Sequence, residues 1–83
     1  MSGYHLKEIK RGVFGESSKI LEETEEFMDA RAQGCKVMAL MELADLVGAI
    51  KGYLDKHAPG FTIRDLEDMA KITERVFKNG HRS

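Results

Sequence analysis

Apolar residues recur at helical spacing in three segments of this chain, and no segment alternates as a β-strand would. The first segment runs from about Glu16 to Ala32, and the second from about Lys36 to Lys56. In the second, the apolar positions have a 3-4-3-4 spacing, typical of a helix that packs nearly antiparallel against its neighbours. These positions are Leu40, Leu43, Val47, Ile50 and Leu54. We expect the other helices of the chain to cover this seam.

The third segment has the clearest start. Thr62 and Asp65 have the spacing of a capping box, in which each side chain binds the backbone N–H of the other residue. Gly80 is expected to end this helix, and Gly34 to end the first. Pro59 separates the second helix from the third, because proline disfavours helical geometry in the residue before it.

Residues 1–15 have no single interpretation. They form either a short helix broken at Gly12 and Gly15 or an arm that lies on a partner. The pattern as a whole predicts an all-α fold, with residues 1–83 as one domain. Because a chain of this length buries only about 60–65% of its unfolded surface, its stability is marginal unless it associates. We therefore expect an antiparallel bundle of about three to four helices per chain, completed by oligomerisation.

The charge and composition of the chain argue against some classes of function. The formal net charge of −1 gives no global reason to bind nucleic acid or an anionic membrane. Residues 16–29 nevertheless carry six acids against one lysine, whereas residues 69–83 carry four Lys/Arg against one glutamate. The single Cys35 excludes an internal disulfide. With no signal-peptide pattern and no apolar run of the roughly 18–20 residues that span a bilayer, a cytoplasmic protein is expected.

Two clusters of acids stand out against this background. On the first helix Glu22, Glu23 and Glu26 share one face. On the second, Glu42 and Asp45 lie one turn apart and are the only charges within VMALMELADLVGAI, residues 37–50. A helix that is apolar nearly all round is normally buried, and buried carboxylates must be paired, protonated or bound to metal.

The first cluster alone is compatible with a solvated acidic face, and the second alone with a pair that reaches arginines of another helix. Glu25 and Asp29 are expected to point further round the first helix, toward solvent. Together, the two clusters predict a different arrangement. Two antiparallel helices would bring them face to face as a cage of oxygen ligands, which suits Mg²⁺ or Mn²⁺ rather than zinc or copper.

The pattern Glu-Glu-x-x-Glu, followed after about fifteen residues by Glu-x-x-Asp, resembles the signature of the MazG-like all-α nucleoside triphosphate pyrophosphohydrolases. The resemblance is carried by Glu22, Glu23, Glu26, Glu42 and Asp45, within KILEETEEFMDA and MELADLVGAI, and covers about half the chain. It implies Mg²⁺-dependent hydrolysis of an NTP or dNTP between the α and β phosphates, giving the monophosphate and pyrophosphate. It also implies a homodimer or homotetramer.

All five acids are candidate catalytic residues. Glu23, Glu26, Glu42 and Asp45 are expected as metal ligands, and Glu22 as a ligand or a water-orienting base. Cations must cover the remaining phosphate charge, and the candidates are Lys19, Arg75, Lys78 and Arg82. His5 and His57 are expected to be surface or interface residues.

Two alternatives stay open from the sequence. One is a non-catalytic helical module that binds a nucleotide or a partner protein. The other is a structural helical oligomer whose acids pair with Lys or Arg of another subunit, with no metal in the cage. Neither membrane nor nucleic acid is an expected partner, and the sequence does not select the base or sugar of a nucleotide.

Overall fold

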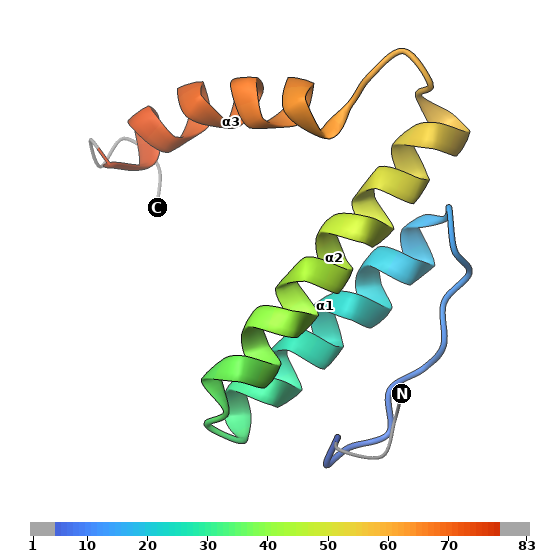
Figure 1. Cartoon of the computed structure of the whole chain (residues 1–83), viewed down its shortest axis with the longest axis vertical. Helices are drawn as coiled ribbons and strands as arrows, with labels where there is room; N and C mark the ends of the chain where they lie inside the picture. Colours follow the sequence, from blue (N-terminus) through green and yellow to red (C-terminus); the bar gives the residue numbers. More distant parts are fainter. Residues whose placement is uncertain (1–4, 79–83) are drawn as a thin grey trace.

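The computed structural model describes residues 5–78, and it is all-helical. Its elements are α1 (Ser17–Ala32), α2 (Lys36–His57) and α3 (Ile63–Lys78), and the described residues contain no strand (Figure 1). The predicted all-α class is confirmed. For α1 and α2 the predicted bounds differ from the observed ones by about one residue. Helix α3 begins directly after the predicted cap at Thr62, whereas Gly80, which is predicted to end it, lies outside the described residues.

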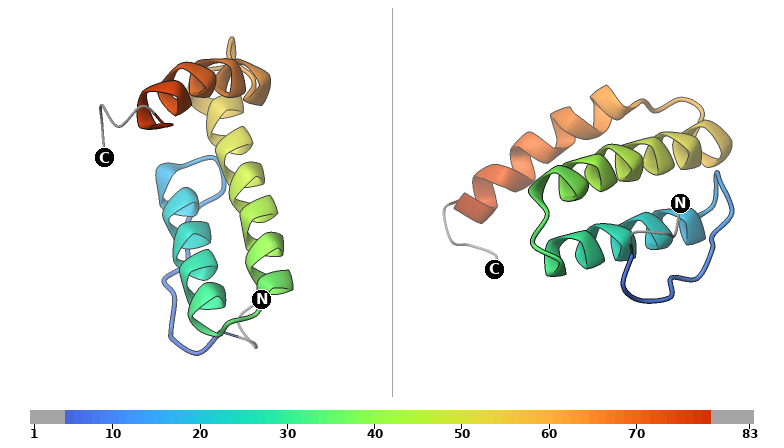
Figure 2. Two further views of the ribbon diagram at one scale, coloured as in Figure 1. Left: turned by 90° about the vertical axis from the view of Figure 1, so that its left-hand side faces the viewer. Right: turned by 60° about the horizontal axis from the view of Figure 1, so that its bottom comes forward.

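Helices α1 and α2 form an antiparallel hairpin, which is the only extensive helix–helix contact among residues 5–78 (Figure 2). The turn between them is short because Gly34 adopts a φ of 76°, a left-handed conformation that other residues rarely take. The backbone N–H of Gly34 donates to the carbonyl of Arg31 at 2.9 Å, which closes the end of α1 as the sequence predicts.

Helix α3 begins at the predicted capping box. The backbone N–H of Thr62 donates to the Asp65 carboxylate at 2.8 Å, and the backbone N–H of Asp65 donates to the Thr62 hydroxyl at 3.2 Å. Beyond this turn α3 leaves the hairpin rather than lying along it (Figure 1). The single chain is therefore a helical hairpin with a projecting third helix, and not a closed bundle.

The prediction that the chain covers the 3-4-3-4 seam of α2 is wrong. Leu40, Leu43 and Val47 are exposed, at 60%, 38% and 49% respectively, and of the seam only Leu54 is buried. Helix α2 instead turns toward α1 the face that carries Glu42 and Ala49, which are fully or almost fully buried. The seam lies on another side of α2, where α3 would have to fold back to cover it.

The N-terminal arm, residues 5–16, is not a helix, and it lies along its own chain (Figure 2). It runs antiparallel to α1, with Leu6 donating its backbone N–H to Asp29 and Gly12 donating its backbone N–H to Glu22. At Gly12 the backbone of the arm comes so close to α1 that only glycine fits. A Cβ at this position would lie 2.2 Å from the carbonyl oxygen of Ser18. The Ser18 hydroxyl accepts the Val13 N–H at 3.0 Å and so helps to hold the arm at the start of α1.

Among residues 5–78, no helix is both long enough and apolar enough to cross a membrane.

Candidate metal centre

Carboxylates are prominent among the buried side chains of the α1–α2 hairpin. Among residues 5–78, the buried hydrophobic residues are Ala30, Ala49 and Leu54. The buried charged residues outnumber them and are Glu22, Glu23, Glu26, Asp29 and Glu42. Glu42 has no exposed surface at all, although acids are almost never fully buried unless they are paired. Acids buried in this way must be paired, protonated or bound to a cation.

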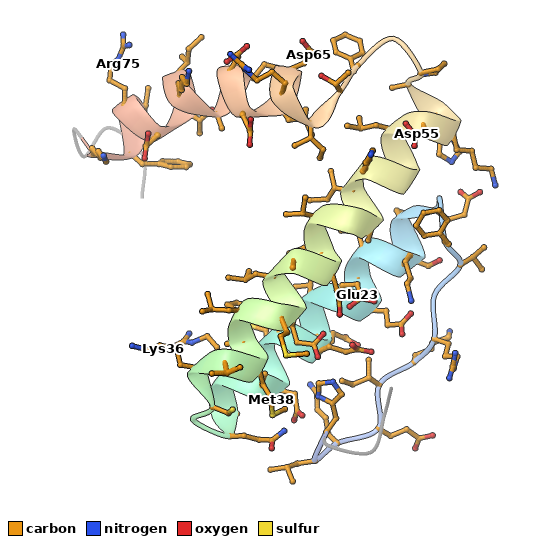
Figure 3. The ribbon with its side chains drawn as sticks, in the orientation of Figure 1. Glu23, Lys36, Met38, Asp55, Asp65 and Arg75 are labelled. Atoms are coloured by element: carbon orange, nitrogen blue, oxygen red, sulfur yellow. The ribbon has the colours of Figure 1, made fainter. Side chains whose placement is uncertain are left out.

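Two groups of oxygen ligands form where the helices face each other. Glu22, Glu23 and Glu26 of α1 make one group, and Glu23 joins Glu42 and Asp45 of α2 in the other. Within each group the ligand oxygens lie within 4.8 Å of one another. Glu23, labelled in Figure 3, belongs to both groups. The structure thus brings all five sequence-predicted acids together, and Asp45 is the one that is exposed.

One oxygen of this cluster has no partner. Glu23 places Oε2 3.2 Å from the Lys19 ammonium, whereas its buried Oε1 accepts no hydrogen bond within the described part of the chain. A buried carboxylate oxygen without a donor carries a desolvation penalty of about 1–3 kcal/mol or more. A bound cation would remove this penalty.

The ammonium group of Lys19 neutralises part of the negative charge at one edge of the cluster. Its ammonium donates to Glu22 at 3.0 Å, and the hydrogen bond to Glu22 is the main reason that the pKa of Lys19 is raised. Burial by itself would raise the pKa of Glu22, but the Gly12 N–H and the Lys19 ammonium outweigh it and hold that pKa below its ordinary value. Glu22 is therefore ionised at neutral pH.

His5 also belongs to the site, and the expectation of a surface or interface histidine is wrong for this residue. Its side chain is only 2% exposed. Nδ1 lies 2.9 Å from Asp29, while Nε2 lies 3.3 Å from Glu42 and 3.6 Å from Glu26. The arm thus brings His5 to acids of α1 and α2 that are far from it in the sequence, and no helical spacing could indicate that approach.

Asp29 was expected to point toward solvent, and this is also wrong. It is buried beneath the arm, where its carboxylate accepts hydrogen bonds from His5, the Leu6 N–H and the Gln33 amide. Burial would raise the pKa of Asp29, but these three donors lower it below its ordinary value. Asp29 thus anchors one end of the arm, whereas Glu23 and Glu26 form ligand groups with Glu42 of the opposite helix. His57 lies at the other end of the hairpin, 2.9 Å from the exposed Glu16, as expected of a surface residue.

Glu26 has the most perturbed carboxyl group of the cluster. Burial, followed by the charge of Glu23 and the interaction with Glu42, raises the pKa of Glu26 from 4.5 to about 7. Near neutral pH its proton competes with any cation for the same oxygens.

This shift predicts a pH dependence of stability in metal-free protein. Because the pKa of folded Glu26 lies above the unfolded value, the folded state binds the proton more tightly, and its stabilising effect is lost as pH rises through 7. We expect the free energy of unfolding to fall between about pH 5 and 7, by on the order of 1–3 kcal/mol. The lowered pKa values of Glu22 and Asp29 act only at more acidic pH.

Urea unfolding at a series of pH values, in the presence of a chelator, measures this slope. Glu26→Gln should be nearly flat over the same interval, because its amide does not titrate. A slope that is the same in Glu26→Gln and in the unsubstituted protein would assign the effect to another group.

Of the cations predicted to bind phosphate, one lies beside the carboxylates and two lie away from them. Lys19 lies in the cluster, paired with Glu22 and Glu23. Arg75 and Lys78 are exposed on α3, and Figure 3 shows Arg75 at the distal end of that helix, well separated from Glu23. Within one chain, then, neither reaches the carboxylates. Arg82 lies outside the described residues.

Comparisons of the chain with protein-family models, with curated proteins and with solved structures found no match. What can be said of the site therefore rests on its own residues.

Proposed function

We propose that this chain is a Mg²⁺-dependent nucleotide pyrophosphohydrolase that cleaves an NTP or dNTP between the α and β phosphates. The products would be the nucleoside monophosphate and pyrophosphate, and Mn²⁺ is the alternative metal. One observation carries the proposal: acids from two helices converge inside the hairpin, and the buried Oε1 of Glu23 has no donor among residues 5–78.

The charges of the site support a cation there. Within residues 5–78, the five buried acids are Glu22, Glu23, Glu26, Asp29 and Glu42, and Lys19 and His5 are the basic side chains that form ion pairs with them. Even with Glu26 protonated, four carboxylates face two basic groups. Two of the three candidate ligand groups among the described residues consist of carboxylates alone, and the third adds the His5 imidazole to Glu26 and Glu42. A set made mainly of carboxylate oxygens suits a hard divalent ion such as Mg²⁺, which keeps part of its water and is shared with substrate phosphates.

Each residue has a distinct task in this proposal. Glu23, Glu26, Glu42 and Asp45 hold the metal, and a metal so held supplies charge neutralisation at the phosphates and an acidified water. Glu22 is fixed by the Gly12 N–H and by Lys19, and it stays ionised, so it can orient a water and accept its proton. Asp45 is exposed and lies where the cluster opens to solvent, on the side from which substrate can approach.

The proposal predicts that metal stabilises the fold. A ligand that binds only the folded protein adds RT ln(1 + [L]/Kd), about 2.7 kcal/mol when its concentration is one hundred times Kd. Millimolar Mg²⁺ or Mn²⁺ should therefore raise the melting temperature by several degrees, and chelator should reverse the increase. A melting temperature indifferent to both would contradict a metal centre and favour acids that pair with cations of another subunit.

The activity itself is tested by incubating the protein with canonical and modified NTPs and dNTPs in Mg²⁺ and identifying the phosphate products. Monophosphate and pyrophosphate in equal amounts, formed only with metal, would support the proposal. Release of inorganic phosphate would indicate a different hydrolysis. Metal and nucleotide binding without turnover would indicate the alternative, a non-catalytic nucleotide- or partner-binding module.

We further propose that the active form is a homodimer or homotetramer in the cytoplasm. The support is the inverted distribution of side chains, with acids inside the hairpin and large apolar groups outside it. The large exposed apolar residues on the two helices are Val37, Leu40, Met41, Leu43 and Val47 of α2 and Met69, Ile72 and Phe77 of α3. Apolar surface of this extent on two helices is typical of a protein–protein interface.

A further inference from the structure

A groove beside the acidic cluster has walls of opposite charge. It has a volume of ≈ 640 Å³ and is lined by residues 5–11 of the arm and by Glu22 and Glu26 of α1. Binding sites for small molecules have volumes of about 300–1,000 Å³. The α1 wall belongs to the proposed metal centre, whereas the arm contributes Lys7, Lys10 and Arg11.

Within the described part of the chain, these three cations have no carboxylate partner. All three are exposed, and none makes an ion pair with any residue between 5 and 78. By contrast, Lys19 is already paired with Glu22 and Glu23, and Lys56 with Glu16. Glu8 is the single acid among residues 7–11, so this part of the arm has an excess of two positive charges.

The structure holds this part of the arm from both ends. On one side, the Leu6 N–H donates to Asp29 at 3.0 Å, next to the buried His5. On the other, the Gly12 N–H donates to Glu22 at 2.9 Å, and Val13 donates to Ser18. Only five residues separate Leu6 from Gly12, so the three cations cannot move far from the groove. Ordering that is already present in the free protein lowers the entropic cost of binding a ligand.

We propose that Lys7, Lys10 and Arg11 of the N-terminal arm bind the polyphosphate of the substrate, opposite the carboxylates that hold the metal. The inference rests on the proposed function and names the phosphate-binding residues of that same site. It replaces Arg75 and Lys78, which α3 carries away from the cluster. An arginine forms paired hydrogen bonds with phosphate oxygens, and lysines add charge, so a polyphosphate fits between the two walls.

The chemistry of a metal-bound polyphosphate requires both walls. A nucleoside triphosphate carries more negative charge than one divalent cation neutralises, and the acidic wall would repel whatever charge remains. Cations on the facing arm supply the balance without competing for the carboxylates. The recognised class of ligand is thus a magnesium-bound polyphosphate chain, independent of base and sugar.

The test measures the binding of inorganic tripolyphosphate by calorimetry in saturating Mg²⁺. The double variant Lys10→Gln/Arg11→Gln should bind it at least about tenfold more weakly than the unsubstituted chain, since charge-assisted hydrogen bonds are lost. The increase of melting temperature with Mg²⁺ alone should be unchanged, because the carboxylates are intact. Lys36→Gln, which removes an exposed, unpaired cation at the start of α2, is the matched control and should bind normally.

Equal affinity of the double variant and the unsubstituted chain would overturn this inference. So would a loss confined to Arg75→Gln/Lys78→Gln, which would assign the phosphates to α3. Either result leaves the proposed function standing if the unsubstituted chain still hydrolyses nucleotides. An unsubstituted chain that binds Mg²⁺ but neither binds tripolyphosphate nor turns over any nucleotide would contradict both proposals.

Discussion

Glu42→Gln is expected to reduce metal-dependent nucleotide hydrolysis by at least about 100-fold, because losing one charged ligand weakens the metal and misplaces its chemistry. Glu42 is completely buried between α1 and α2, in the group that also contains Glu23 and Asp45. The amide keeps the shape of the carboxyl group, so the helical hairpin should persist. Turnover under saturating Mg²⁺, with circular dichroism as the check on the fold, measures the effect.

The same substitution should stabilise the metal-free protein by roughly 1 kcal/mol, because it removes one negative charge from a cluster of like charges. Asp45→Asn should also lose turnover, with a smaller effect on stability, since Asp45 is exposed. Asp55→Asn is the control on the same helix, because Asp55 is exposed and belongs to none of the ligand groups. Full activity in Glu42→Gln would place the site elsewhere, and an unfolded Glu42→Gln would make Glu42 a structural partner of a buried cation.

The helices and the convergence of the acids could be predicted because both depend on local spacing. The 3.6-residue period places Glu22, Glu23 and Glu26 on one face, and a short turn at Gly34 forces α2 to run back along α1. These two local features are sufficient to predict that Glu42 lies close to Glu23. The capping box of Thr62 and Asp65 is equally local, and it is formed as predicted.

The errors concern contacts between segments that have no fixed relation in the sequence. The apolar residues of the arm have no helical period. The hydrophobic pattern therefore could not predict that His5 lies beside Glu42 or that the arm buries Asp29. The spacing of Leu40, Leu43 and Val47 correctly predicts an apolar face, but the expectation that the other helices of the chain cover it is wrong. Periodicity identifies a face that must be covered, but it does not say whether the same chain or another copy covers it.

The exposed seam of α2 is expected to bind a second copy of the chain. At micromolar concentration, light scattering or sedimentation should show a dimer or tetramer, with α2 and α3 at the interface. Val47→Glu should convert it to a monomer, because placing a carboxylate in an apolar interface costs several kcal/mol without a partner. Leu6→Glu places the same charge at an exposed apolar position of the arm and should leave the assembly intact.

A substitution at Gly48 tests the same interface independently. A Cβ at Gly48 would meet no atom of the described residues within 4 Å. In a monomer, Gly48→Ala should therefore stabilise α2 by about 0.5–1 kcal/mol through its higher helix propensity. If another helix packs closely there, as Ala44 and Gly48 would allow, the added methyl group should instead weaken the oligomer. A well-folded monomer that Gly48→Ala simply stabilises would exclude this interface, and it would leave the apolar side chains of α2 and α3 facing water with no partner to bury them.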